Sequence, residues 1–172
     1  MTISSILPVD RFLLTLDIVS REGGHLAYSW NRLYQRQVID VTWVNSLETH
    51  PELAERVEAF ISRFGRMQDT IADKLLPRWL MALAETPGSQ IETLNRAERL
   101  GIIENVEHWL EARKLRNKLV HEYMESAETF AEDLMLGKEY ALMLLDSFNR
   151  LREFAAVRMG IEEAQLPKPL RL

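Results

Sequence analysis

The sequence has no cysteine, which rules out disulfide bonds, thiolate metal sites and cysteine nucleophiles. It also has no apolar run near the roughly 18 uninterrupted residues that a membrane-spanning helix needs. Residues 1–17 include Pro8, Asp10 and Arg11 among apolar residues and have no basic start, so we expect no secretory leader. We therefore expect a protein of the cytoplasm with no membrane partner.

Positive charge and metal ligands are also scarce. The formal net charge of −5 argues against a protein that coats nucleic acid, but it permits an enzyme that cuts RNA with a few localised basic residues. His25, His50 and His108 are scattered without acids at metal-ligand spacing, so we predict no metal. The one Glu-x-x-His string, Glu22 to His25, contains a double glycine and lacks the second copy that a di-iron bundle needs. No glycine-rich phosphate loop is present, and we expect no cofactor.

Glycine and proline are few, with seven and six residues, and the apolar residues between them recur three and four positions apart. This is the period of amphipathic helices, and it predicts an all-α antiparallel bundle. We expect a helical extension at residues 1–50, a helical bundle at residues 51–160 and a short tail at residues 161–172, within one compact domain. The four tryptophans lie in amphipathic segments and are expected in the core rather than on a base-stacking surface.

Local signals in the first half of the chain predict where helices end. Gly23 and Gly24 are expected to stop a first helix, and a second is expected from Leu26 to about Gln37. The β-branched residues 38–44 are read as part of a helix or a packed connector. A long helix is expected to start at Thr49–Glu52, with a bend at Gly65 and a disruption at Pro77.

In the second half, Ser89 is the predicted N-cap of a helix, with Glu92 completing a capping box. That helix should end near Leu100–Gly101. The next is expected from about Glu104 to His121 or Tyr123, and a last long helix should follow Ser126. Residues 167–172 are expected to be extended or frayed.

The most informative stretch is residues 116–123. It places Arg116, Asn117, His121 and Tyr123 within just over two helical turns, and these groups suit the binding of a phosphodiester and the movement of its protons. At about 100° per residue, Tyr123 lies about 20° to one side of Arg116, while Asn117 and His121 lie about 100° and 140° to the other side. The core-facing sector is then made by Ala112, Leu115 and Leu119, and the solvent-facing residues are Glu111, Lys114, Lys118 and Glu122.

A structural interpretation of the same residues is also open. An arginine followed five residues later by a histidine is common on helices. Tyr123 suits the edge of a core with its hydroxyl in water. The basic run from Arg113 to Lys118 suits a solvated face.

The motif and its surroundings resemble the HEPN family, and more closely the HepT toxins that are paired with a nucleotidyltransferase antitoxin. The likeness is tight over residues 100–123, including Trp109 and Leu110, and looser over Phe64–Pro77 and the rest of residues 52–154. It implies a HEPN-like bundle and a metal-independent endoribonuclease. It also implies a homodimer or higher homo-oligomer in which motifs from two subunits face one cleft.

The resemblance assigns roles to the motif residues. His121 would be the general acid or base, and Arg116 would stabilise charge on the phosphate. Asn117 would orient the imidazole of His121 or the phosphate. Contacts with RNA phosphates are expected from Arg113, Lys114 and Lys118. Tyr123 would accept adenylate from the cognate nucleotidyltransferase. The alternative is a non-catalytic subunit that presents a nucleotide or another substrate to a nucleotidyltransferase.

Overall fold

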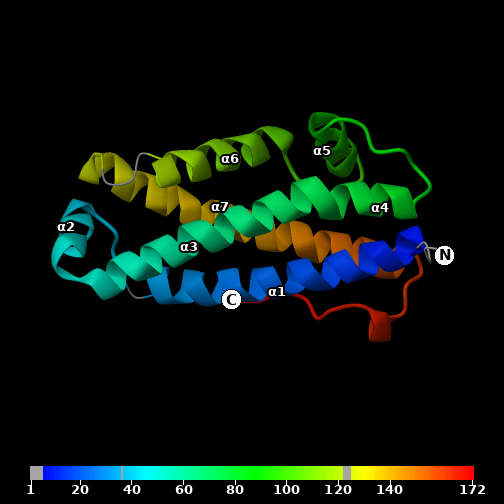
Figure 1. The fold of residues 1–172 in the computed structure, drawn as a ribbon, viewed down its shortest axis with the longest axis horizontal. Helices are drawn as coiled ribbons and strands as arrows, with labels where there is room; N and C mark the ends of the chain where they lie inside the picture. The colour runs from blue at the N-terminus through cyan, green and yellow to red at the C-terminus, as the bar shows by residue number, and fades with distance from the viewer. Residues whose placement is uncertain (1–5, 36, 122–124) are drawn as a thin grey trace, which may run out of the picture.

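Long helices make up most of the chain (Figure 1). The computed structural model describes residues 6–35, 37–121 and 125–172, and no strand occurs within these ranges. The predicted all-α fold is therefore confirmed. The helices are α1 (Pro8–Tyr34), α2 (Val41–Asn45), α3 (Pro51–Thr70), α4 (Leu76–Ala82), α5 (Gln90–Arg99), α6 (Val106–His121) and α7 (Ala127–Val157), with a π-helical turn at Ile71–Leu75 and 3-10 turns at Ser46–Thr49 and Glu163–Gln165. None of these helices is long and apolar enough to cross a membrane.

The long helices α1, α3, α6 and α7 lie side by side, and each runs antiparallel to the next one along the chain (Figure 1). Helix α1 contacts α3, α4 and α7, and α6 contacts both α3 and α7. The short helix α2 packs against α7 at one end of the bundle, and α5 lies beside α4 at the other. Helix α6 therefore has a neighbour on each side and an outer face toward solvent.

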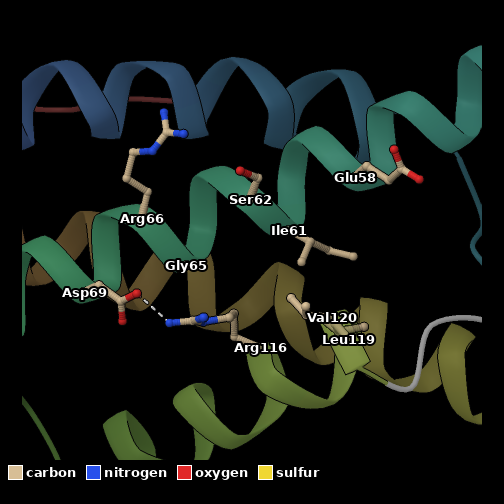
Figure 2. Close-up of a pocket in the computed structure, with 9 residues that line it drawn as sticks. All are labelled: Glu58, Ile61, Ser62, Gly65, Arg66, Asp69, Arg116, Leu119 and Val120. Atoms are coloured by element: carbon tan, nitrogen blue, oxygen red, sulfur yellow. Dashed lines mark hydrogen bonds and ion pairs between the residues drawn. The ribbon is translucent and has the colours of Figure 1, made fainter.

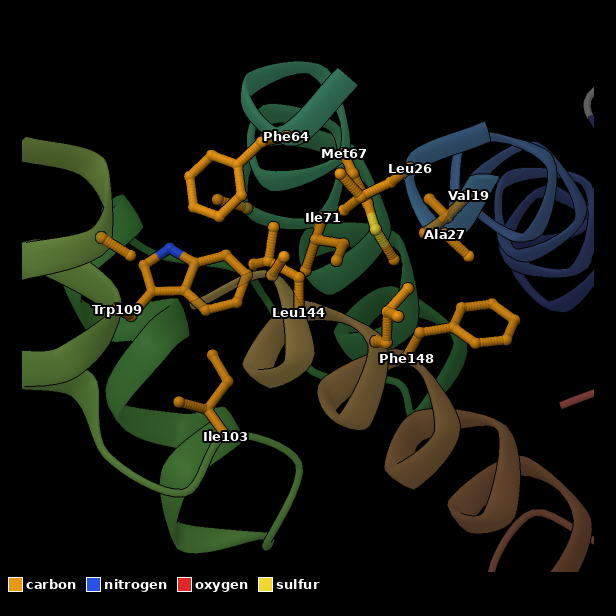
Figure 3. Close-up of a cluster of buried hydrophobic side chains, with 14 of the residues drawn as sticks. Val19, Leu26, Ala27, Phe64, Met67, Ile71, Ile103, Trp109, Leu144 and Phe148 are labelled. Atoms are coloured by element: carbon orange, nitrogen blue, oxygen red, sulfur yellow. The ribbon is translucent and has the colours of Figure 1, made fainter. Parts of the chain in front are cut away.

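One continuous set of apolar side chains from all the long helices forms the core. Figure 3 shows its centre, where Trp109 of α6 points toward residues of α3 and α7. Trp79 and Trp109 are fully buried, and Trp30 and Trp43 are partly buried against the core. The predicted core position of the tryptophans is confirmed. Burial of each large apolar side chain contributes about 1.5–3 kcal/mol, enough to stabilise helices of modest intrinsic propensity.

Helix α1 runs without interruption through Gly23 and Gly24. The predicted helix end at this pair and the separate helix over Leu26–Gln37 are therefore wrong. Glycine weakens a helix by only about 1 kcal/mol per residue, and buried residues on both sides of the pair hold α1 against the core. Gly23 is itself buried, and a Cβ at this position would lie 2.3 Å from Cδ1 of Leu170. Close packing thus accounts for the glycine that resembled a helix stop.

Residues 38–44 lead into α2, which confirms their assignment to a helix and its connector. The helix begins at Val41 because the side chain of Asp40 accepts a hydrogen bond of 2.8 Å from the backbone N–H of Trp43. This N-cap satisfies a donor that has no partner within the helix. Helix α2 then presents Val44 to the core.

Helix α3 begins at Pro51, as predicted, and stays α-helical through Gly65. The irregularity falls at residues 71–75, where the N–H of Leu76 donates to the carbonyl of Ile71, five residues earlier. Pro77 follows, and in a regular helix its ring would clash with the carbonyl four residues before it. The wider π-helical turn relieves this clash, so the predicted disruption near Pro77 is confirmed.

Serine caps fix the starts of α5 and α7. Oγ of Ser89 accepts from the N–H of Glu92 at 3.3 Å, and Oγ of Ser126 accepts from the N–H of Thr129 at 3.4 Å. Both predicted helix starts are therefore confirmed. Helix α5 ends at Arg99, and Gly101 follows with a φ of +81°, a left-handed conformation that glycine adopts at low cost.

Residues 167–172 are extended, as predicted, but they are not frayed. The N–H of Leu170 donates to Oδ1 of Asn149 on α7 at 2.8 Å. Leu166, just before this stretch, is only 9% exposed. The stretch packs against the bundle because its backbone and side chains have specific partners there.

Candidate functional site

Helix α6 carries the motif that begins at Arg116. It starts at Val106, two residues after the predicted start, because Asn105 is its N-cap: Oδ1 of Asn105 accepts from the N–H of His108 at 3.1 Å. The helix ends, in the described part of the chain, at His121. The motif thus occupies the last turns of a helix that the core holds in place.

The buried residues of α6 confirm the angular arrangement inferred from the sequence. Ala112, Leu115 and Leu119 are all buried, as expected for the core-facing sector. Arg116 is half-buried at the border between this sector and solvent, on the side toward α3. A charged group at such a border can reach an anion without losing its protein partners.

The Arg116 side chain crosses from α6 to α3 and lies over Gly65 (Figure 2). A Cβ at Gly65 would lie 3.0 Å from both Cδ and Nε of Arg116, which is closer than ordinary van der Waals contact. Glycine at this position therefore makes room for the arginine. One helical turn further along α3, Oδ2 of Asp69 accepts a hydrogen bond of 2.6 Å from Nη2 of Arg116.

The ion pair between Arg116 and Asp69 orients the guanidinium more than it stabilises the fold. The two side chains are 23% and 45% exposed, and pairs with this exposure contribute about 0–1 kcal/mol. Nε of Arg116 is buried and has no hydrogen-bond partner among the described residues. An unpaired buried donor costs about 1–3 kcal/mol. Because this Nε lies against Gly65, an anion can meet only the exposed part of the Arg116 guanidinium.

A groove of about 490 Å³ opens between α3 and α6 at this pair. It is lined by Glu58, Ile61, Ser62, Gly65, Arg66, Asp69, Arg116, Leu119 and Val120 (Figure 2). Its charged residues are of both signs, and Arg66 points away from Arg116, toward α1. The groove therefore suits a single phosphate at Arg116 better than a long polyanion.

His121 and Asn117 are exposed and do not line this groove. On an ideal helix they lie about 140° and 100° from Arg116, so they face a different direction. Arg116 and His121 therefore do not share one groove in a single chain.

The other basic residues near Arg116 also lie on different faces of α6. Lys118, expected to face solvent, instead forms an ion pair of 3.1 Å with Asp133 of α7, whose side chain is 11% exposed. The charge of Lys118 is therefore partly neutralised on the side of α6 away from the Arg116 groove. Lys114 is exposed and Arg113 is half-buried, so both remain candidates for contacts with a ligand.

Tyr123, the predicted adenylate acceptor, lies outside the described residues, as does Glu122. Its expected role thus continues to rest on the sequence motif. His121, two residues before it, is described and exposed.

Sequence reasoning missed Gly65 and Asp69 as partners of Arg116. Asp69 is 47 residues away from Arg116 in the chain, so no local spacing links them. The available signal is on α3 itself, where Gly65 and Asp69 are four residues apart and therefore share one helix face. A small residue and an acid on one helix face can accommodate an arginine from a neighbouring helix. They do not show which arginine of the chain packs there.

Within the described ranges no group of three or more histidine, aspartate or glutamate residues could hold a metal ion. No family model, curated protein or solved structure matches this chain. Function is therefore inferred from the chemistry of these residues and from the resemblance of the motif.

Proposed function

We propose that this chain is a metal-independent endoribonuclease toxin of the HEPN type, active as a homodimer or higher homo-oligomer in the cytoplasm. One observation carries the proposal. Arg116 is held in the groove between α3 and α6 by Asp69 and Gly65, and its side chain remains 23% exposed there. A guanidinium that is fixed and partly exposed in a groove is suited to donate hydrogen bonds to a phosphate oxygen.

The chemistry needs no metal. The ribose 2′-oxygen attacks the adjacent phosphorus, the bond from phosphorus to the 5′-oxygen breaks, and the products are a cyclic phosphate and a free 5′-hydroxyl. His121 takes the proton from the 2′-hydroxyl or gives one to the leaving 5′-oxygen, and water exchanges the other proton. Arg116 stabilises the negative charge that builds up on the phosphate oxygens. Asn117 orients the imidazole or the phosphate, and Arg113 and Lys114 contact flanking phosphates, whereas Lys118 is paired with Asp133.

The separation of Arg116 and His121 supports the requirement for two copies. In one chain the two groups face different directions, and the groove at Arg116 does not include His121. Two α6 helices that meet near their exposed faces would place the His121 of one copy beside the Arg116 of the other. The composite site explains why a chain with net charge −5 can still bind RNA, because the basic residues of two subunits then face one cleft.

The partner in this proposal is a nucleotidyltransferase antitoxin that adenylates Tyr123. The modification would add a negative charge and bulk close to the phosphate site, and Arg116 would pair with the new phosphate rather than with substrate.

The alternative function is a non-catalytic subunit that binds a nucleotide for a nucleotidyltransferase. It is favoured by the mixed charge of the groove, which suits one phosphate group, and by the fact that His121 is not among the residues that line the groove. Expression of the wild type and of His121→Ala without the partner separates the two functions. Arrested growth and degraded RNA with the wild type alone support the nuclease. Intact RNA with both proteins, each shown to be folded, supports the binding subunit.

A further inference from the structure

The chain turns back after α7 and uses its last residues to cover the side of α1. Gly160 adopts a φ of +68° at the turn, a conformation that favours glycine. Residues 161–172, which we name the strap, then run along α1 (Figure 1). The strap lies against α1 and α7 through polar contacts to its backbone and apolar contacts to its leucines.

The side-chain amide of Asn149 on α7 binds both the carbonyl and the N–H of one strap residue, Leu170. Nδ2 of Asn149 donates to the carbonyl of Leu170 at 3.0 Å, and the N–H of Leu170 donates to Oδ1 of Asn149 at 2.8 Å. A side-chain amide used in this way offers one donor and one acceptor, as the backbone of a neighbouring β-strand would. It recognises an extended backbone whatever the side chains are.

Arg152 makes the second polar contact, three residues further along α7. It is only 8% exposed. Its Nε donates to the carbonyl of Pro167 at 2.5 Å, and its Nη2 pairs with Glu163 at 2.5 Å. A buried guanidinium is costly unless it is paired, and in this fold the strap supplies the partners of Arg152. Asn149 and Arg152 lie on one face of α7 and contact strap residues that are also three apart.

Two leucines anchor the strap. Leu170 lies against Gly23 of α1 so closely that a Cβ there would be 2.3 Å from its Cδ1 and 3.1 Å from Cε of Met67. Leu166 is 9% exposed, in a hollow that Leu13 and Leu14 of α1 also line. The notch at Gly23 therefore selects a side chain of a particular size, while the amide of Asn149 selects an extended backbone.

The strap is also prepared for binding by its own sequence. Pro167 and Pro169 fix their φ angles and restrict the residues before them to extended conformations, and Leu166 has φ −102° and ψ 142°. An extended segment that is restricted before binding loses less conformational entropy when it binds.

We propose that the groove between α1 and α7 is a binding site for an extended peptide with two leucine anchors around a Pro-x-Pro sequence, filled here by the chain's own strap and open to the strap of a second copy. The groove has the parts of a peptide-recognition site: a backbone clamp at Asn149, a buried arginine for a carbonyl oxygen and a notch at Gly23. The chain's own strap has the advantage of a high effective concentration. A strap from another molecule therefore enters when the internal one is released.

The test uses the full chain with one strap residue changed. Leu170→Asp places a charge where an apolar notch requires a leucine, so the strap should leave the groove. The probe is a fluorescent peptide of residues 163–172, followed by anisotropy. We expect Leu170→Asp to bind it at least ~10-fold more tightly than the wild type does, and the double variant Leu170→Asp, Asn149→Ala to lose about 10-fold, as two lost hydrogen bonds imply.

A peptide that carries Leu170→Asp should bind to none of these proteins. Failure of the folded Leu170→Asp chain to bind the peptide would overturn the proposal, and so would equal binding by the double variant. If Leu170→Asp does not fold, Leu170→Ala replaces it in the same assay.

A matched pair of glycine variants tests the notch independently. Gly23→Ala should displace Leu170 and speed hydrogen exchange at its backbone amide by about 10-fold or more, whereas Gly24 has nothing within 4 Å of a built Cβ and Gly24→Ala should leave that exchange unchanged. Equal exchange in the two variants would contradict the notch. Neither result depends on the proposed nuclease activity.

Discussion

Asp69 of α3 holds Arg116 of α6 by a hydrogen bond of 2.6 Å from Nη2 to Oδ2. This contact directs the guanidinium along the groove between the two helices. Because the pair is partly exposed, it is of little value for stability, and its main effect is on the position of the arginine. The proposed nuclease therefore depends on residues of α3 that the sequence motif does not include.

Arg116→Ala and His121→Ala should each reduce RNA cleavage by roughly 100-fold, the usual loss when an electrostatic contact or a general base is removed. Cleavage by the wild type should be unchanged in EDTA, since in the proposed mechanism the ribose 2′-oxygen is the nucleophile and no step uses a metal. The measurement is cleavage of a labelled RNA by purified protein. The matched controls are Arg99→Ala and His108→Ala, exposed residues of the same types. Near-wild-type cleavage by the motif variants would make the motif structural, and a divalent ion that restored EDTA-treated enzyme would remove the proposed mechanism.

Asp69→Ala should lower kcat by about 10-fold with little change in KM, because the arginine loses its fixed position but keeps its charge. The structure predicts that Asp69 acts through Arg116. A double-mutant cycle tests this, since Asp69→Ala should have no further effect in an Arg116→Ala background. Additive losses would mean that Asp69 acts on the RNA by another route.

Gly65→Ala should separate activity from stability. The new Cβ would lie 3.0 Å from Cδ and Nε of Arg116, so the flexible arginine must shift while the helix gains up to about 1 kcal/mol of propensity. We expect an unchanged or higher Tm with cleavage reduced about 10-fold. Gly24→Ala, in open space, should give the same gain in propensity with full activity. Equal cleavage by both variants would show that Arg116 adapts without cost.

These contacts also show what the sequence can predict and what it cannot. The core sector of α6 follows from the spacing of Leu115 and Leu119, which is local information, and the structure confirms it. The start of α5 follows from Ser89 for the same reason. The helix through Gly23 was missed because the contact that requires glycine comes from Leu170, at the other end of the chain. The pair of Asp69 and Arg116 was missed because it joins two helices that are distant in sequence.

Tyr123→Phe should give a protein that folds and cuts RNA but escapes modification by the nucleotidyltransferase partner. The substitution keeps the aromatic ring and removes the oxygen that would accept adenylate. Mass spectrometry after incubation with the partner and ATP should show added adenylate on the wild type and none on the variant. Equal labelling of both proteins would place the acceptor at another residue.

Glu22→Gln should stabilise the fold at neutral pH. Burial raises the pKa of the Glu22 carboxyl above its usual 4.5, although a hydrogen bond from Thr70 and the charges of Arg66 and Lys74 act in the opposite direction. Oε1 of Glu22 is buried and has no hydrogen-bond partner among the described residues.

The sign of the pH effect follows from this raised pKa. The folded protein binds the proton more tightly than the unfolded chain does, so the free energy of unfolding falls as pH rises from the usual value of 4.5 through the folded pKa. At pH 7 the charged carboxylate is therefore unfavourable in the fold. The neutral amide removes that cost and should raise the Tm by roughly 2 °C. The gain should shrink as the pH is lowered toward 4, where Glu22 is itself protonated in the fold. Thermal unfolding of the two proteins between pH 4 and pH 8 measures the difference, and a gain that stayed constant across this range would assign it to something other than the charge of Glu22.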